Sequence, residues 1–150
     1  MFSMKLKVAS ILLLVILFMC GCNKEDPVSA EQYIADKKLI GFEKTKEGLY
    51  YKIDVPGADL KPNLGSTVTV NYRGTLTDGS EFDSSIKRGV PLEIGLSNVI
   101  AGWRIGIPLF GKGGKGTLII PPKLGYGSAG QNSIPGNSVL IFDIELINFK

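Results

Sequence analysis

The chain has 150 residues, of which 44% are hydrophobic and 21% charged, a composition typical of a single globular domain. Its formal net charge is +3, but Lys5 and Lys7 lie in an N-terminal segment that we expect to be removed. The remaining residues, 22–150, carry 15 basic side chains (17 minus these two) against 14 acidic ones. This balance argues against a nucleic-acid surface, which needs clustered positive charge to neutralise phosphates.

Residues 1–21 have the pattern of a signal peptide. Lys5 and Lys7 give it a positive start, and residues 8–19 form a mainly apolar run of twelve residues. A helix of that length spans about 18 Å, whereas the hydrocarbon core of a bilayer is roughly 30 Å thick, so a transmembrane helix is the poorer interpretation. The pattern predicts an exported protein.

Both cysteines lie at the end of this segment. The sequence Met19-Cys20-Gly21-Cys22 resembles a bacterial lipobox, in which the final cysteine is lipidated and becomes the first mature residue; Cys20 fits that pattern less well. Two or more acyl chains hold a protein stably on a bilayer, so lipidation of Cys22 predicts a membrane-anchored protein of the cell envelope, facing the periplasm or the exterior. The alternative is an ordinary signal peptide with two inert cysteines.

Residues 22–46 are predicted to be a polar tether with a short helix. Ser29 and Gln32 have the spacing of a capping box, and the helix should run towards Lys38 and stop near Gly41. We interpret this helix as a spacer, because its side chains suggest no chemistry.

Residues 47–150 change to short runs with the character of β-strands. The expected strands cover residues 49–55, 67–76, 117–120 and 138–149. Asp78-Gly79 is the signal of a tight hairpin, and the only good helix candidate in this part lies around residues 101–107, closed by Pro108. The pattern predicts an α+β fold with an antiparallel sheet curled round one short helix.

Several common chemistries are excluded by residue type. The chain contains no histidine, which removes Ser-His-Asp and Cys-His triads and histidine-based zinc sites. Residues 125–130 satisfy the GxGxxG pattern of dinucleotide-binding loops, and Glu145 follows at about the expected distance. However, Pro121-Pro122 precedes the glycines and Pro135 stands where a helix should begin, so this segment is interpreted as a glycine-rich turn.

A set of aromatic, aliphatic and acidic residues instead predicts an apolar cup with a few fixed polar groups. Its members are Tyr72, Phe82, Asp83, residues 99–103, Tyr126 and Phe142. This combination is the usual anatomy of a pocket for a small molecule or a side chain.

The segments that carry this cup also carry a resemblance. In chain order, VTVNYRGTL, TDGSEFDSS, VIAGW, LIIPPKLGYG and VLIFDIELI resemble the FKBP-type peptidyl-prolyl isomerases, the family that binds tacrolimus and rapamycin. The resemblance covers about residues 48–150. It implies a five- or six-stranded antiparallel half-barrel wrapped on a short helix, with the active site between the helix and the concave face of the sheet.

The resemblance also implies a function and a set of partners. The reaction is cis/trans rotation about the bond before proline, which needs no nucleophile, metal or cofactor. The expected partners are proline-containing polypeptides, exported proteins above all, and macrolides such as tacrolimus and rapamycin.

The resemblance assigns roles residue by residue. Trp103 is expected to form the floor of the pocket, and its walls are expected to be Tyr72, Phe82, Val99, Ile100, Ile134 and Phe142. The expected catalytic groups are the Asp83 carboxylate, held near Tyr72 and Arg88, the Tyr126 hydroxyl, the Ile100 backbone N–H and the Phe82 ring. Each wall residue has an alternative interpretation as ordinary core, and Asp83 as a surface turn.

Three departures from the family pattern concern the ligand. Leu92 stands where many members have an aromatic wall residue, Gln131 replaces a common histidine, and the loop before Ile134 is one residue shorter. They bear on ligand affinity and on the residue preferred before proline.

Two alternatives to an enzyme stay open. The same pocket could serve a binding or chaperone module for proline-containing segments, or it could be vestigial in a structural lipoprotein. Retention of Tyr72, Asp83, Trp103 and Tyr126 together speaks against the vestigial case.

Overall fold

The structure is a computed structural model, and it describes residues 28–150. The predicted signal peptide, residues 1–21, and the predicted lipidation site Cys22 lie outside the described residues.

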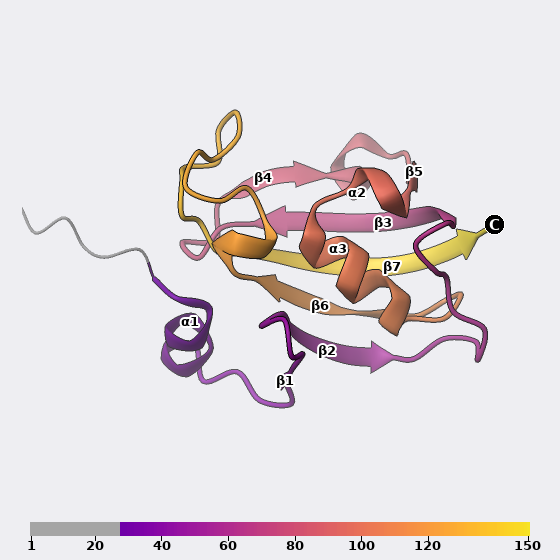
Figure 1. The fold of residues 1–150 in the computed structure, drawn as a ribbon, viewed down its shortest axis with the longest axis horizontal. Coiled ribbons are helices and arrows are strands. Elements are labelled where there is room, and N and C mark those ends of the chain that lie inside the picture. The colour runs from indigo at the N-terminus through magenta and orange to yellow at the C-terminus, as the bar shows by residue number, and fades with distance from the viewer. Residues whose placement is uncertain (1–27) are drawn as a thin grey trace, which may run out of the picture.

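One antiparallel sheet forms the body of the molecule (Figure 1). Its order is β1-β2-β6-β7-β3-β4, and β5 pairs with β3 beside β4. The strands are β1 Glu43–Lys44, β2 Tyr50–Val55, β3 Thr67–Thr75, β4 Glu81–Ser84, β5 Leu92–Gly95, β6 Lys115–Ile120 and β7 Leu140–Phe149. The predicted α+β class is confirmed. The described part contains seven strands, one more than the upper expected number, and the two-residue β1 lies at the edge of the sheet.

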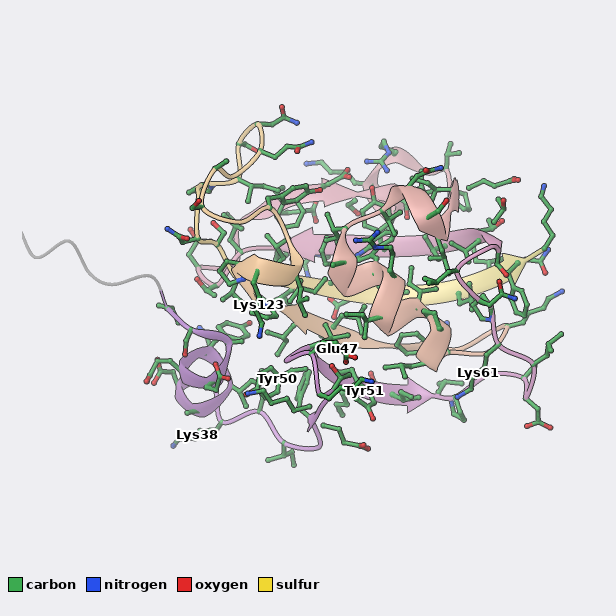
Figure 2. All side chains as sticks on the ribbon, viewed as in Figure 1. Lys38, Glu47, Tyr50, Tyr51, Lys61 and Lys123 are labelled. Carbon is green, nitrogen blue, oxygen red and sulfur yellow. The ribbon has the colours of Figure 1, made fainter. Side chains whose placement is uncertain are left out.

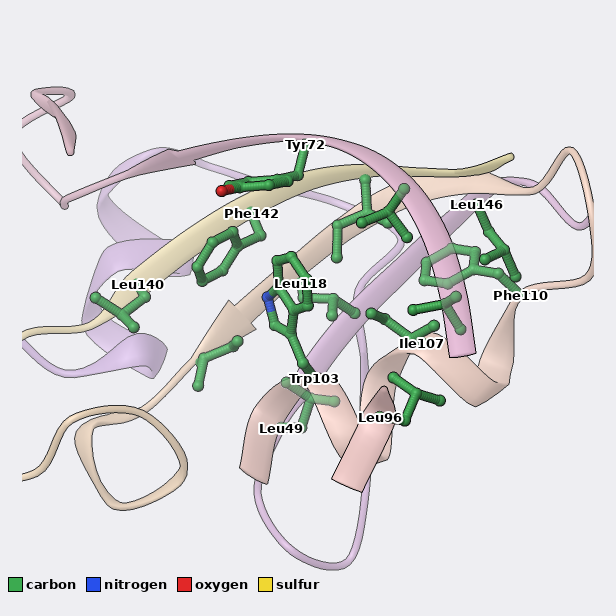
Figure 3. Packing of buried hydrophobic residues seen from close by; sticks show 14 of the residues in the cluster. Leu49, Tyr72, Leu96, Trp103, Ile107, Phe110, Leu118, Leu140, Phe142 and Leu146 are labelled. Carbon is green, nitrogen blue, oxygen red and sulfur yellow. The ribbon is translucent and has the colours of Figure 1, made fainter. Parts of the chain in front are cut away.

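Side chains of β6 and β7 point alternately to the two faces of the sheet, and both faces are apolar. Leu118 and Phe142 face the larger cluster of buried residues, whereas their neighbours Ile119 and Ile141 face a smaller one on the opposite side. Successive side chains of a strand point to opposite faces, so these two strands separate two cores. Figure 3 shows the larger core, between the sheet and α3 (Ala101–Gly106).

Two glycines let α3 pack directly on β6. A Cβ at Gly106 would lie 2.4 Å from Leu118 Cδ1, and one at Gly102 would lie 2.6 Å from Ile120 Cδ1. Larger residues would therefore push the helix away from the sheet. The helix continues into the 3₁₀ turn η2 (Ile107–Leu109), which contains Pro108, so the predicted helix ends close to where the proline indicated.

The predicted N-terminal helix is present as α1 (Ala30–Asp36). The Ser29 hydroxyl accepts the backbone N–H of Gln32 at 3.1 Å, as expected, but the Gln32 side chain donates to Asp36 instead of returning to Ser29. Ala30 is buried in the smaller core. The helix therefore packs against the sheet, a contact that the interpretation as a spacer did not include.

Short elements connect the strands around the pocket. They are the helix α2 (Ser85–Arg88) and the 3₁₀ turns η1 (Leu96–Asn98) and η3 (Pro122–Leu124). The predicted Asp-Gly hairpin joins β3 to β4, and Gly79 there has a φ of 88°, which favours glycine. The sequence did not indicate α2, because four residues are too few for a helical period. The GxGxxG segment follows η3 as turns, as predicted.

Candidate functional site

A pocket of about 570 Å³ lies between α3 and the sheet. Its lining includes all nine residues predicted for the site: Tyr72, Phe82, Asp83, Val99, Ile100, Trp103, Tyr126, Ile134 and Phe142. They come from strands β3, β4 and β7, from the start of α3 and from the loop after η3. The fold thus brings together segments that are 70 residues apart in the chain.

Perpendicular aromatic contacts fix the deep end of the pocket. The Trp103 ring lies 5.1 Å from Tyr72 and 5.2 Å from Phe142 between centroids, with interplanar angles of 81° and 78°. Phe82 meets Phe142 at 5.5 Å and 85°. Edge-to-face contacts of this kind stabilise a pair beyond its buried area. Each ring therefore limits the rotation of its neighbour, and the apolar surface keeps its shape.

The Trp103 indole is almost fully buried, with 4% of its surface exposed. Among the described side chains, its Nε1–H is the only buried polar group without a hydrogen-bond partner. In Figure 3 the nitrogen lies on the side of the indole next to Phe142. The floor of the pocket is therefore aromatic, with one buried N–H that no described group accepts.

A charged cluster forms one edge of the pocket. Tyr72 Oη donates to one oxygen of the Asp83 carboxylate, and the Arg88 guanidinium binds the other. Arg88 also donates to Tyr72 Oη at 2.9 Å, which closes a triangle of three side chains from β3, β4 and α2. The predicted proximity of Asp83 to Tyr72 and Arg88 agrees with this geometry.

The cluster holds Asp83 in its charged form. Burial acts to raise the pKa of the carboxyl, but the hydrogen bonds from Tyr72 and Arg88 outweigh it, so the pKa lies below its ordinary value. Burial and the hydrogen bond to Asp83 raise the pKa of Tyr72. Near neutral pH the edge therefore presents a carboxylate compensated by a guanidinium, beside a neutral phenol.

Two of the residues that line the pocket, Ile100 and Tyr126, carry polar groups without such partners. Ile100 is the N-cap of α3, and its carbonyl accepts from Trp103 and Arg104, while its own N–H makes no backbone hydrogen bond within residues 28–150. The Tyr126 hydroxyl likewise has no hydrogen-bond partner in the described part of the chain, and burial raises the pKa of Tyr126. Both groups are available to a ligand.

Sequence reasoning missed part of the lining. Ile94, Asn98, Asn132 and Ser133 also face the pocket, and so do Leu92 and Gln131, which had been noted only as departures from the family pattern. Strand β5 explains two of them, because Leu92 and Ile94 alternate on one side and pair with Val70 and Val68 of β3. The alternation of apolar and other residues over 92–95 could have predicted this strand and its two lining residues.

Comparison with known proteins decides the family. The family model described as FKBP-type peptidyl-prolyl cis-trans isomerase matches residues 58–147. The chain belongs to this family. The match covers all the pocket residues named above.

Individual relatives agree with this assignment. The chain is 47% identical over 131 residues to the FKBP-type isomerase FkpA of Buchnera aphidicola subsp. Schizaphis graminum, covering 85% of this chain and 52% of that protein. It is 48% identical over 113 residues to FkpA of Escherichia coli K12, covering 75% and 42%. The chain thus spans about half the length of the curated relatives it matches.

Solved structures support the fold. The crystal structure of FkpA from Escherichia coli matches with a TM-score of 0.76 and 46% identity, over 80% of this chain and 56% of that one. An isomerase structure from Pseudomonas syringae matches with a TM-score of 0.72 and 32% identity, over 80% and 90%. Within residues 28–150, none of the helices has the length and apolar character needed to cross a membrane.

Proposed function

We propose that this protein is a peptidyl-prolyl cis-trans isomerase that acts on Xaa-Pro bonds of exported proteins. The observation that carries the proposal is the rigid aromatic pocket, which has the size for a proline side chain and its neighbours and two uncommitted donors at its edge. Family membership supports the same reaction.

Catalysis of this rotation requires the barrier to be lowered by only a part of its height. The uncatalysed barrier is about 18–20 kcal/mol, and exchange takes tens to hundreds of seconds. Turnover within milliseconds requires a barrier lower by roughly 6–7 kcal/mol, at about 1.4 kcal/mol per tenfold in rate. Binding and desolvation alone can account for a reduction of that order.

The apolar floor supplies the first part of that reduction. Amide resonance is lost when the bond is twisted, so the carbonyl oxygen carries less negative charge in the transition state than in the planar ground state. Burial of a poorly paired amide costs about 2–7 kcal/mol. A pocket built on Trp103 and Phe142 therefore disfavours the planar amide more than the twisted one.

The donors supply orientation. The Ile100 N–H lies at the start of α3 and can bind a peptide carbonyl beside the proline, while the Tyr126 hydroxyl can bind a second carbonyl. Two fixed contacts hold the chain in the turn-like pose from which rotation proceeds. Asp83 keeps the Tyr72 ring and its hydroxyl in place at the edge, and the Phe82 ring covers the bond.

Proline-containing polypeptides are the proposed substrates, and tacrolimus and rapamycin are proposed ligands of the same pocket. The decisive measurement is the isomerisation rate of a short Xaa-Pro peptide with the purified protein, with and without rapamycin. Acceleration that the drug abolishes is the expected result. If the folded protein gives no acceleration, the enzyme proposal is wrong and a proline-binding or chaperone module replaces it.

An Asp83→Ala variant separates catalysis from binding. If the pocket is catalytic, this change lowers turnover more than it weakens peptide affinity, because the Asp83 cluster shapes the edge where the twisted bond lies. Equal losses in turnover and in affinity favour simple binding. Ser66→Ala, which removes a buried hydroxyl away from the pocket, is the control for general destabilisation.

We also propose that Cys22 is lipidated and that the protein is anchored to a membrane of the cell envelope, facing the periplasm or the exterior. The support is the Met19-Cys20-Gly21-Cys22 pattern after an apolar segment. Metabolic labelling with radioactive palmitate tests it. Cys22→Ala should abolish the label and Cys20→Ala should retain it; a label that survives Cys22→Ala contradicts the assignment.

A further inference from the structure

Strand β3 has a gap along the edge that it shares with β4 and β5. The last pair with β4 is Arg73 with Ser84, and the first pair with β5 is Val70 with Leu92. Asn71 and Tyr72 lie between these pairs and have no described strand partner on that edge. The chain leaves the sheet here to form α2, which Figure 1 shows beside β3.

The side chain of Ser85 fills this gap. It is completely buried, and its Oγ accepts the backbone N–H of Tyr72 at 2.8 Å. The same hydroxyl lies 3.4 Å from the Tyr72 carbonyl oxygen and 3.4 Å from Asn71 Oδ1, either of which can accept its proton. The hydroxyl thus does for Tyr72 what a neighbouring strand would do, and the buried N–H is satisfied.

Ser85 also anchors α2. It is the only residue of that four-residue helix that is buried, and the next residue, Ile86, is 63% exposed. Arg88, at the other end of α2, reaches Asp83 and Tyr72 Oη. Among the described residues, side-chain hydrogen bonds join α2 to β3 only through the Ser85 hydroxyl and through Arg88.

We propose that Ser85 is a positioning residue of the pocket: its buried hydroxyl holds α2 against β3 so that Arg88 stays on Asp83 and Tyr72. Ser85 touches no ligand and acts through these three side chains. The expected effect of Ser85 on catalysis rests on the proposed function. Its expected effect on the contacts between Tyr72, Asp83 and Arg88 does not.

The first test is Ser85→Ala, with Ser66→Ala as the matched control. Ser66 is also a buried serine whose hydroxyl accepts a backbone N–H, that of Asn63 at 3.2 Å, but it lies outside the pocket lining. Both variants lose a serine hydroxyl that accepts a backbone N–H, so both are expected to unfold more easily. Only Ser85→Ala should reduce kcat/KM, by about three- to tenfold, because only it loosens Arg88.

The second readout is the pKa of Asp83, measured from its carboxyl carbon by NMR. The ionisable groups around Asp83 are Tyr72 of β3, Arg88 of α2 and, more distantly, Tyr126. In Ser85→Ala the pKa should rise towards the ordinary value, because contacts that stabilise the carboxylate weaken, and in Ser66→Ala it should stay unchanged. In an Arg88→Ala background, adding Ser85→Ala should change this pKa little further.

Ser85→Cys covers the case in which the alanine variant does not fold, since a thiol is similar in shape and accepts hydrogen bonds weakly. It should shift the Asp83 pKa in the same direction. The proposal is overturned if a folded Ser85→Ala or Ser85→Cys protein keeps both the Asp83 pKa and kcat/KM, or if the effects of Ser85→Ala and Arg88→Ala on the pKa simply add. An unmodified protein without isomerase activity would reject the proposed function, and the pKa readout would still decide the role of Ser85.

Discussion

Strands β6 and β7 contribute side chains to both faces of the sheet, but the two faces differ in how they are covered. On one face, Leu118 and Phe142 contribute to a large core that α3 closes only in part, and the open part is the pocket. On the other face, Ile119 and Ile141 form a small core that α1 covers through Ala30. One face is left partly open, and α1 covers the other, which we call the sealed face.

The difference lies in how each helix is held. Glycines bring α3 into direct contact with β6, so its position is fixed by close packing and Trp103 is fixed with it. Helix α1 is held by the buried Ala30 and also by polar contacts at the surface, where Glu31 accepts from Lys44 Nζ at 2.8 Å and from Tyr50 Oη at 2.7 Å. Figure 2 shows Tyr50 on the side of the molecule that carries α1. Changes on the two faces should therefore separate activity from stability.

The largest effect is expected from Trp103→Ala. Removing a buried indole leaves a cavity in the larger core, and we expect a loss of about 3–5 kcal/mol in the free energy of unfolding together with loss of isomerase activity. Urea unfolding followed by circular dichroism measures the first quantity. Trp103→Phe, which keeps an apolar ring, should lose clearly less stability. A loss below about 1 kcal/mol for the alanine variant would show that the floor is not part of the core.

The matched change on the sealed face is Ile119→Ala. Ile119 is fully buried, so the expected loss of stability is about 2–5 kcal/mol. The side chain points away from the pocket, and the activity per folded molecule should stay within about twofold of the unmodified protein, less than 0.5 kcal/mol in barrier. Isomerase assays at a temperature where both proteins are folded check this. A large fall in specific activity would mean that the two faces are coupled.

The sequence was sufficient to predict the features that repeat or carry strong local signals. The alternation of apolar and polar residues predicted the long strands, and Asp78-Gly79 predicted the hairpin. Pro108 predicted the end of the helix that carries Trp103. All nine predicted site residues line one pocket. The strands, the hairpin and the helix end depend on residues close together in the chain, and the site residues were named from family motifs, so their roles stay a prediction.

The features that escaped prediction depend on contacts between distant segments. The helix α2 is too short for a period, and it exists where Ser85 replaces a missing strand partner of Tyr72. The packing of α1 depends on Ile119 and Val139, about 90 residues or more further along the chain. A pattern within a short stretch of sequence cannot predict contacts with such distant residues.

A smaller effect is expected from Tyr72→Phe on the ligand face. The ring stays in the aromatic cluster, but Asp83 and Arg88 lose the hydroxyl that bridges them. Because the cluster is partly exposed, we expect a loss of about 1 kcal/mol in the free energy of unfolding. The Asp83 pKa should rise, so the carboxylate protonates at higher pH than in the unmodified protein. NMR titration of Asp83 measures this shift, and an unchanged pKa would contradict the assigned hydrogen bond.

The smallest effect is expected on the sealed face, from Glu31→Gln. Hydrogen bonds from Lys44 and Tyr50 lower the pKa of Glu31 from 4.5 to about 2. A folded-state pKa below the unfolded value stabilises the protein above about pH 4.5, and the stabilisation is lost as the pH falls towards 2. The difference in unfolding free energy between the unmodified protein and Glu31→Gln should therefore be small, constant near neutral pH, and shrink between pH 4.5 and 2.

Urea unfolding at several pH values measures that difference, and Tyr50→Phe provides the graded control because it removes one of the two donors and leaves the Lys44 contact. Glu31 is largely exposed, so water and salt screen the pair and the effect should decrease further in high salt. Isomerase activity should not change in either variant. A difference that is the same at pH 2 and pH 7 would mean that Glu31 does not titrate as the geometry requires, and that apolar packing alone holds α1 on the sheet.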